Sequence, residues 1–369
     1  MHIDRIDVYR VAMPLTTPFR TAFGDDGSIE AVLVRLGSGD VAGWGEGAPN
    51  LPTYSPESAG GAFLTIRDYL APRLIGRDVA SGEHLQALLA PIKGNRFAKA
   101  ALDLAWWDLE AKRREMPLWR LLGGRGPEVT VGADFGVQDS LDELLAKVTA
   151  AVEAGFARIK LKFRRGWDVD MVRAVRGAFP DATIHVDCNS GFTLADMAMF
   201  EQLDAFDLAM IEQPLAYDDL VDHAELARRI ATPICLDESI TSVDKARKAI
   251  DLGVVGYVNI KNGRVGGITH AVAVHDYCRE AGVPCWVGGM LESAVGSRHN
   301  LALATLDNFT YPADVFSSKR FYDPDLAGPE VVHSGPSTIT APEEPGCGSE
   351  PIAERLEART VEHVEIRGS

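Results

Sequence analysis

The sequence has few of the features that mark secreted or membrane proteins. Its five cysteines are odd in number and lack CxxC spacing, so we expect reduced thiols rather than disulfides. No apolar run approaches the roughly 18 residues that span a bilayer. The N-terminal stretch MHIDRIDVYRVAMPL alternates charges and lacks the apolar segment of a signal peptide. These absences predict a soluble, cytoplasmic protein with no membrane partner.

Positive charge is also scarce. The 369 residues include 37 Lys and Arg against 53 Asp and Glu, a net charge of −16, which argues against nucleic-acid binding. Walker A, GxSxG and HExxH motifs are absent, so NTPase, serine-hydrolase and zinc-protease interpretations lack their markers. The length and the 46% apolar content suit a globular protein of one large or two ordinary domains.

The first 125 residues have a mixed α+β pattern. Strand-like runs separated by turn residues occupy 3–13, 29–36 and 41–46. A long helical pattern covers 95–114, with Asn95 as the expected N-cap and basic residues at its end. The Gly/Pro cluster LLGGRGPE at 121–128 then predicts a domain boundary.

Beyond residue 128, short apolar runs alternate with amphipathic helical segments. The eight runs lie at 129–135, 158–163, 182–188, 208–213, 233–238, 256–261, 284–289 and 313–317. Strands that alternate with helices indicate parallel βα units, and at this count they favour a closed (β/α)7β barrel, a modified TIM barrel of the α/β class, over 126–318.

Polar residues recur at the ends of five of these runs. Lys162, Asp187, Glu212, Asp237 and Lys261 follow one another at spacings of 25, 25, 25 and 24 residues. One βα unit of a short strand, a helix and two loops totals roughly 25 residues, so each occupies the same place in its unit. In a parallel barrel that place is the C-terminal rim, where catalytic residues collect.

The three acids at this rim indicate a metal site. Neighbouring carboxylates such as Asp187, Glu212 and Asp237 repel one another unless a cation lies among them, and oxygen ligands suit Mg²⁺ or Mn²⁺. A lone acid after a strand is more often a turn former or a helix cap, but three on adjacent strands favour the metal.

The two lysines flank the acids in chain order. Lys162 and Lys261 are therefore expected on opposite sides of the metal, where they could act as acid and base on two faces of one carbon. The alternative is that they only balance the acids. Lys160 shares the face of Lys162 one layer deeper, and we expect its charge to lower the pKa of Lys162.

Other polar residues are weaker candidates. His185 shares the face of Asp187 but lies deeper, so a hydrogen-bonded core histidine is expected. His299 follows the seventh run and is expected to face solvent. The stretch KNGRVGG at 261–267, with Arg264, could form an anion-binding nest.

Six motifs together resemble the enolase superfamily, in its muconate-lactonizing-enzyme subgroup. They are RIKLKF, HVDCNSGF, AMIEQPL, PICLDESI, NIKNGRVGG and WVGGMLES, and they are most similar to the o-succinylbenzoate synthase and N-succinylamino acid racemase branch. The resemblance implies an α+β capping domain over residues 1–125, completed by 319–369, above the barrel. PFRTAFG and LPTYSPES are similar to the family's two capping loops.

The resemblance also implies roles for individual residues. The implied metal ligands are Asp187, Glu212 and Asp237, with Asn189 and Glu238 beside them. Lys162 would be the base of the KxK motif and Lys261 its counterpart. The implied substrate-binding residues are Phe19, Tyr54, Met290, Leu291 and Arg264, the last matching an arginine of racemases.

Two departures from the family pattern affect the substrate. Asp134 stands where serine is usual, so its carboxylate would repel an anionic substrate group or attract an amine. The second departure is ESAVGSRHN, which replaces the usual ESGxGR. The implied activity is Mg²⁺-dependent α-proton abstraction from a small-molecule carboxylate. The product would be o-succinylbenzoate, in menaquinone biosynthesis, or a racemised N-succinylamino acid.

Three alternatives stay open. They are dipeptide epimerisation, muconate cycloisomerisation and, from a different class, a catalytically silent metal-binding or scaffold protein. A silent protein has no chemical need for both rim lysines, which argues against it. We expect a homo-oligomer with a small-molecule substrate and no nucleic-acid partner.

Overall fold

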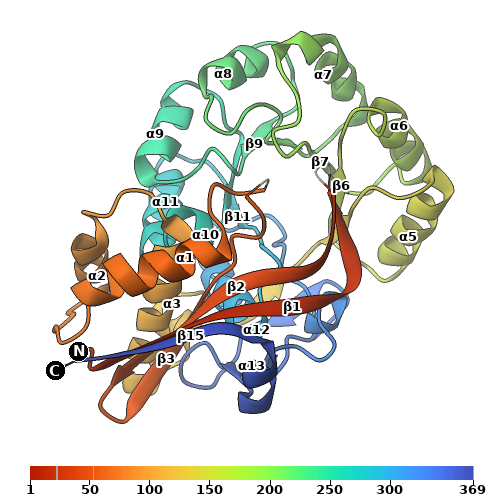
Figure 1. Cartoon of the computed structure of the whole chain (residues 1–369). Coiled ribbons are helices and arrows are strands. Elements are labelled where there is room, and N and C mark those ends of the chain that lie inside the picture. The colour runs from red at the N-terminus through yellow and green to blue at the C-terminus, as the bar shows by residue number, and fades with distance from the viewer. Residues whose placement is uncertain (22–23, 53, 369) are drawn as a thin grey trace.

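The computed structural model describes residues 1–21, 24–52 and 54–368. Within these ranges, the side chains of residues 19–21 and 24–26 are not described. The first and the last strand of the described chain belong to one antiparallel sheet. Its order is β15-β1-β2-β3, so the C-terminal strand pairs with the N-terminal one, and Figure 1 shows the two termini side by side. The bounds are β1 (Arg5–Thr21), β2 (Gly24–Ser38), β3 (Val41–Gly47) and β15 (Thr360–Arg367).

Helix α3 (Arg96–Arg113) packs closely on β3 because the strand carries glycine on one face. A Cβ atom at Gly45 would lie 2.2 Å from the carbonyl oxygen of Ala101, and one at Gly43 would lie 2.3 Å from that of Ala105. The alternating glycines of VAGWGEG therefore let the helix backbone approach the sheet. The other cap helices are α1 (Ala59–Thr65) and α2 (Gly82–Leu89).

Asn95 is the N-cap residue of α3, as expected, but its side chain does not cap the helix. It has φ 51°, and its side chain accepts no capping hydrogen bond. Glu57 caps the helix instead, since its carboxylate accepts hydrogen bonds from the backbone N–H groups of Phe97 at 3.2 Å and Ala98 at 3.3 Å. The helix start is thereby tied to the loop at 51–58.

The described residues also form a parallel sheet in the order β5-β6-β7-β8-β9-β10-β11. Its strands are β5 (Ala133–Phe135), β6 (Ile159–Lys162), β7 (Ile184–Asp187), β8 (Ile211–Glu212), β9 (Ile234–Leu236), β10 (Tyr257–Ile260) and β11 (Cys285–Val287). The order follows the chain without exchange, as consecutive right-handed βα units predict.

Helices connect these strands and lie outside them, and Figure 1 shows α5 to α9 in an arc around the sheet. They are α5 (Leu141–Glu153), α6 (Val169–Ala178), α7 (Met197–Leu203), α8 (Val221–Ala227), α9 (Val243–Asp251), α10 (Asn262–Val265), α11 (Ile268–Glu280) and α12 (Ala294–Ala304). Two further α-helices are α4 (Leu118–Leu121) and α13 (Ala353–Arg359). None of the described helices is both long and apolar enough to cross a bilayer.

Two of the eight expected barrel strands differ from the prediction. The first run is divided into β4 (Glu128–Thr130), which pairs with β13 (Thr338–Thr340), and β5. The eighth run forms an isolated bridge between Ala313 and Val131 instead of a strand. Its backbone still reaches both neighbours: the N–H of Asp314 donates to Val287 O at 2.9 Å, and that of Gly132 donates to Ala313 O at 3.1 Å.

Short antiparallel pairs complete the described sheets, with β12 (Ala327–Gly328) beside β14 (Glu350–Pro351). The architecture is that of a modified TIM barrel with a separate antiparallel sheet. The division of the chain at 125 and 318 stays a prediction.

Candidate active site

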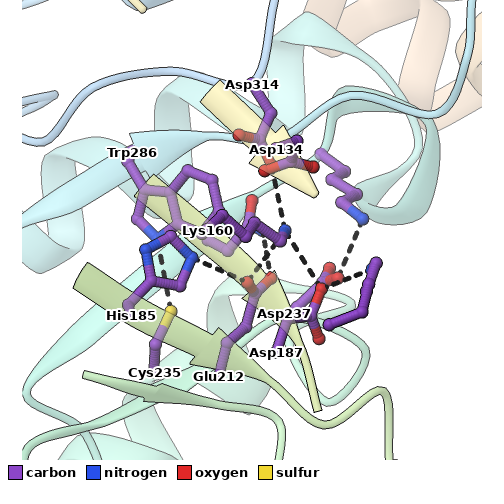
Figure 2. A network of polar contacts seen from close by, with 12 residues as sticks. Asp134, Lys160, His185, Asp187, Glu212, Cys235, Asp237, Trp286 and Asp314 are labelled. Atoms are coloured by element: carbon purple, nitrogen blue, oxygen red, sulfur yellow. Dashed lines mark hydrogen bonds and ion pairs between the residues drawn. The ribbon is translucent and has the colours of Figure 1, made fainter. Parts of the chain in front are cut away.

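The strand ends bring the five spaced residues together, as expected. Lys162, Asp187 and Glu212 end β6, β7 and β8, and Lys162 lies opposite Asp187 and Asp187 opposite Glu212 in the strand register. Asp237 and Lys261 directly follow β9 and β10. All are buried except Lys162, whose side chain is 16% exposed. Figure 2 shows the three acids gathered at this end of the sheet.

Each rim lysine is paired with a different acid. Lys162 Nζ lies 2.7 Å from Asp187 Oδ2 and donates a hydrogen bond to Asn189 Oδ1 at 2.8 Å. Lys261 Nζ lies 2.9 Å from Asp237 Oδ2. Two separate ammonium groups therefore border the same group of carboxylates.

Lys160 lies deeper and touches three carboxylates. Its Nζ is 3.0 Å from Asp187 Oδ2, 2.9 Å from Glu212 Oε2 and 2.9 Å from Asp314 Oδ2. Burial opposes its charge, but these acids outweigh burial and hold the pKa of Lys160 well above its usual value. Lys160 is therefore a fixed positive charge among the acids (Figure 2).

The expected lowering of the pKa of Lys162 is outweighed by its acid partner. Burial and the charge of Lys160 both lower the pKa of Lys162, but Asp187 raises it by more. The net pKa of Lys162 therefore lies above its ordinary range. For Asp187, burial raises the pKa, while Lys160 and Lys162 outweigh burial and lower it. The tuning role of Lys160 stays a prediction.

The acids have the donor chemistry of a site for a hard cation. Burial and then Asp187 raise the pKa of Glu212 to about 7, because negative charge is crowded there. Within the described residues, Glu212 Oε2 and both oxygens of Asp237 accept no hydrogen bond of regular geometry. In the described ranges, no three His, Cys, Asp or Glu side chains are grouped so that they could hold a metal ion. Lys160 Nζ instead lies within 3.0 Å of both Asp187 and Glu212.

The residues expected beside the metal ligands extend the network. Asn189 donates from Nδ2 to Glu238 Oε1 at 3.2 Å. Arg264 Nε lies 3.1 Å from Asp237 Oδ1, so Arg264 and Lys261 share one carboxylate. Arg264 therefore lies against the rim. The anion nest expected of KNGRVGG stays a prediction.

One chamber contains both rim lysines, and we call it the substrate chamber. Most of the expected substrate-binding residues border it with Lys160, Lys162 and Lys261: they are Tyr54, Asp134, Met290 and Leu291. Arg264 instead lines a neighbouring pocket that Tyr54 also borders. The side chain of Phe19 lies outside the described part of the structure.

Three residues of the site were missed from the sequence. Arg158 is fully buried, donates to Asp134 Oδ1 at 3.1 Å and pairs with Asp314. It precedes Lys160 by two residues, so the period-two pattern that related the two lysines could have found it. Asn259 donates to Glu212 Oε1 at 2.7 Å and also stands two residues before a rim lysine. No comparable spacing from a lysine in the sequence identifies Asp314.

The structure confirms the expectation for one histidine and contradicts it for the other. His185 is a buried core histidine, as expected, with Nδ1 2.9 Å from the Tyr311 hydroxyl. The expectation that His299 faces solvent is wrong. It is buried on α12, with its ring nitrogens 2.8 Å from Val295 O and 3.1 Å from Leu104 O, because the cap helix α3 covers this face of the barrel.

Comparisons with known proteins match most of the chain. Residues 5–123 match the mandelate racemase and muconate lactonizing enzyme N-terminal domain, and residues 143–355 match the enolase C-terminal domain-like family. The chain is 45% identical to o-succinylbenzoate synthase of Geobacillus kaustophilus, covering 98% of this chain and 96% of that protein. It is 43% identical to N-succinylamino acid racemase of Thermus thermophilus, covering 96% and 97%.

Solved structures share the whole fold. A member of the enolase superfamily from Listeria innocua superposes with a TM-score of 0.95 at 35% identity, over 100% of this chain and 99% of that one. A dipeptide epimerase from Cytophaga hutchinsonii, complexed with Mg and the dipeptide D-Ala-L-Val, superposes with a TM-score of 0.91 at 25% identity over all of both chains. The chain therefore belongs to the enolase superfamily, within its muconate-lactonizing-enzyme subgroup.

Proposed function

We propose that this enzyme removes the α-proton of a small carboxylate substrate with the help of Mg²⁺, acting as an o-succinylbenzoate synthase, an N-succinylamino acid racemase, or both. The observation that carries the proposal is the placement of Lys162 and Lys261 in one chamber, each paired with a different acid. One relative named for each activity matches nearly the whole chain, which supports the choice of reaction.

Asp187, Glu212 and Asp237 would hold the Mg²⁺, and Mn²⁺ has the same ligand preference. Asn189 and Glu238, which contact each other, would orient the ligands. When bound, the ion supplies positive charge that stabilises the negative charge developing on the substrate carboxylate. The magnesium in the dipeptide epimerase structure supports this assignment.

The two lysines would carry the proton. In racemisation Lys162 removes it from one face of the α-carbon and Lys261 serves the other face. In dehydration Lys162 removes the proton and then assists loss of the β-hydroxyl group, while Lys261 stabilises the enolate. Burial lowers the pKa of each lysine, but Asp187 raises that of Lys162 and Asp237 raises that of Lys261 by more. Neutralising these two acids would therefore favour the uncharged amine that a base requires.

One observation favours dipeptide epimerisation as a second candidate. The carboxylate of Asp134 borders the chamber and could receive a substrate ammonium group. However, Arg158 already donates to Asp134 Oδ1 at 3.1 Å and balances its charge, which weakens that attraction. We therefore rank the epimerase second.

The test is a substrate panel in D₂O with the purified protein and Mg²⁺. N-succinylamino acids should exchange the α-hydrogen for deuterium, followed by NMR, and formation of o-succinylbenzoate is assayed in parallel. Chelation with EDTA should stop both reactions, and added Mg²⁺ should restore them. Exchange in dipeptides alone would favour the epimerase. No exchange in any substrate together with no formation of o-succinylbenzoate would contradict the proposal.

A further inference from the structure

One cation of the substrate chamber forms no direct ion pair with a described residue. Arg320 borders the chamber together with Lys162 and Lys261, yet it forms no ion pair with any described residue. Its Nη2 donates to a backbone carbonyl, that of Asp134, at 2.5 Å. The charge of this guanidinium is therefore available to a ligand.

The acids that border the chamber are already paired. Asp134 accepts a hydrogen bond from Arg158, and Asp314 pairs with both Arg158 and Lys160. Glu292 accepts hydrogen bonds from the Met290 N–H at 2.8 Å and from Asn300 at 3.0 Å. Burial lowers the pKa of Arg320, and Asp134 and Asp314 act against that effect from a distance. None of these carboxylates forms an ion pair with Arg320 within the described residues, so the cation without a direct ion pair in the chamber is Arg320.

The guanidinium is also held in place before any ligand arrives. Its carbon lies 4.3 Å from the ring centroid of Phe316 and 5.5 Å from that of Phe321. Thr16 of β1 fixes the backbone, because its hydroxyl donates to Arg320 O at 3.1 Å and its N–H donates to Phe321 O at 2.8 Å. A preorganised guanidinium loses less freedom when it binds an oxyanion.

We propose that Arg320 binds a second carboxylate of the substrate, remote from the carbon that loses its proton. The ligand class is a dicarboxylate in which one carboxylate lies at the metal ligands and rim lysines and the other, as in a succinyl group, reaches Arg320. This inference rests on the proposed function for the position of the first carboxylate. A charge-assisted, two-pronged hydrogen bond to a carboxylate is the contact that an arginine makes best.

Two substrates that differ only in the charge of the distal group test this contact. N-succinyl-phenylalanine carries the carboxylate, and N-succinamoyl-phenylalanine replaces it with an amide of the same shape. For Arg320→Gln we expect kcat/KM of α-hydrogen exchange to fall about 10- to 100-fold with the succinyl compound, mainly through KM. The succinamoyl compound should change less than about threefold, and Arg320→Lys should retain part of the preference.

The neighbouring Lys319→Gln variant is the matched control, since it also removes one positive charge but its exposed side chain does not border the chamber. It should leave both substrates unchanged. Equal losses with both substrates in Arg320→Gln would show a purely structural role and overturn the proposal. An unchanged preference for the succinyl compound would overturn it as well.

Binding separates this inference from the proposed function. Calorimetric titration with both compounds needs no turnover. If the wild type exchanges neither substrate and forms no o-succinylbenzoate, the proposed function fails. A succinyl preference in binding that disappears in Arg320→Gln still supports Arg320 as the residue that binds the distal carboxylate. If the wild type binds both compounds equally, the assignment of Arg320 is overturned whatever the enzyme catalyses.

Discussion

Lys160 Nζ lies 2.9 Å from Asp314 Oδ2, and this contact joins β6 to the segment that takes the place of an eighth strand. Both side chains are buried. Asp314 also pairs with Arg158, so one carboxylate balances two buried cations at the point where the barrel closes. The arrangement couples the stability of the barrel to the position of the deep lysine in the candidate site.

Asp314→Asn is expected to destabilise the fold by about 3 kcal/mol, because it leaves two buried cations with less compensation. The free energy of unfolding in urea measures the effect. Asp170→Asn is the matched control, since the Asp170 side chain is 86% exposed, and its ion pair with Arg173 is worth less than about 1 kcal/mol. A loss at Asp314 no larger than that of the control would contradict a structural role for the network.

Gly288 leaves room for a rim lysine. A Cβ atom there would lie 2.4 Å from Asn259 Oδ1 and 2.7 Å from Lys261 Cε. Gly288→Ala should therefore displace Lys261 and lower the exchange rate by about tenfold or more, while the side chains move enough to keep the loss of stability near 1 kcal/mol. Gly177→Ala is the control, because a Cβ there meets no atom within 4 Å. Full activity in Gly288→Ala would show that Lys261 is not held by this contact.

Glu57, not Asn95, should determine the stability of the start of α3. Glu57→Ala removes the carboxylate that accepts the N–H groups of Phe97 and Ala98, so it should cost about 1–2 kcal/mol. Asn95→Gly should cost only a few tenths of a kcal/mol, because glycine tolerates the positive φ and no capping bond is lost. Thermal or urea unfolding compares the two, and the reverse ranking would contradict the assignment.

Glu46 should make stability depend on pH. Its carboxylate is buried against the start of α12, where it accepts hydrogen bonds from Ser293 and Gly296, and burial raises its pKa to about 7. The folded state therefore binds the proton more tightly than the unfolded state. This contribution is fully present below the unfolded pKa near 4.5 and is lost as the pH rises through 7.

Glu46→Gln removes this titration. Between pH 4.5 and 7.5 the unfolding free energy of the wild type should fall by about 3 kcal/mol relative to that of the variant. The same change at the exposed Glu354 is the control. A difference between wild type and Glu46→Gln that does not vary with pH would contradict the raised pKa.

Much of this architecture could be predicted from the sequence, because a βα unit has a nearly fixed length. That regularity placed Lys162, Asp187, Glu212, Asp237 and Lys261 at successive strand ends. The prediction of an eighth strand over 313–317 is wrong, because this segment forms only an isolated bridge. An apolar run in the sequence does not reveal how many backbone hydrogen bonds the segment makes.

The charge network was less accessible from the sequence. Arg158 and Asp314 are 156 residues apart, and their pairing depends on how the barrel closes. The capping role of Glu57 also depends on a tertiary contact with α3, whereas Asn95 matched the local pattern. Local periodicity therefore predicts which residues share a strand end, but it does not predict which distant side chains neutralise one another.

The roles of the two rim lysines are the central claim. Lys162→Ala and Lys261→Ala should each abolish racemisation of an N-succinylamino acid, with losses of at least about 100-fold, because each enantiomer needs a base on one face and an acid on the other. The measurement is racemisation in D₂O with Mg²⁺, starting from each enantiomer in turn. The account predicts no racemisation by either variant from either enantiomer, and racemisation retained by either variant would contradict it.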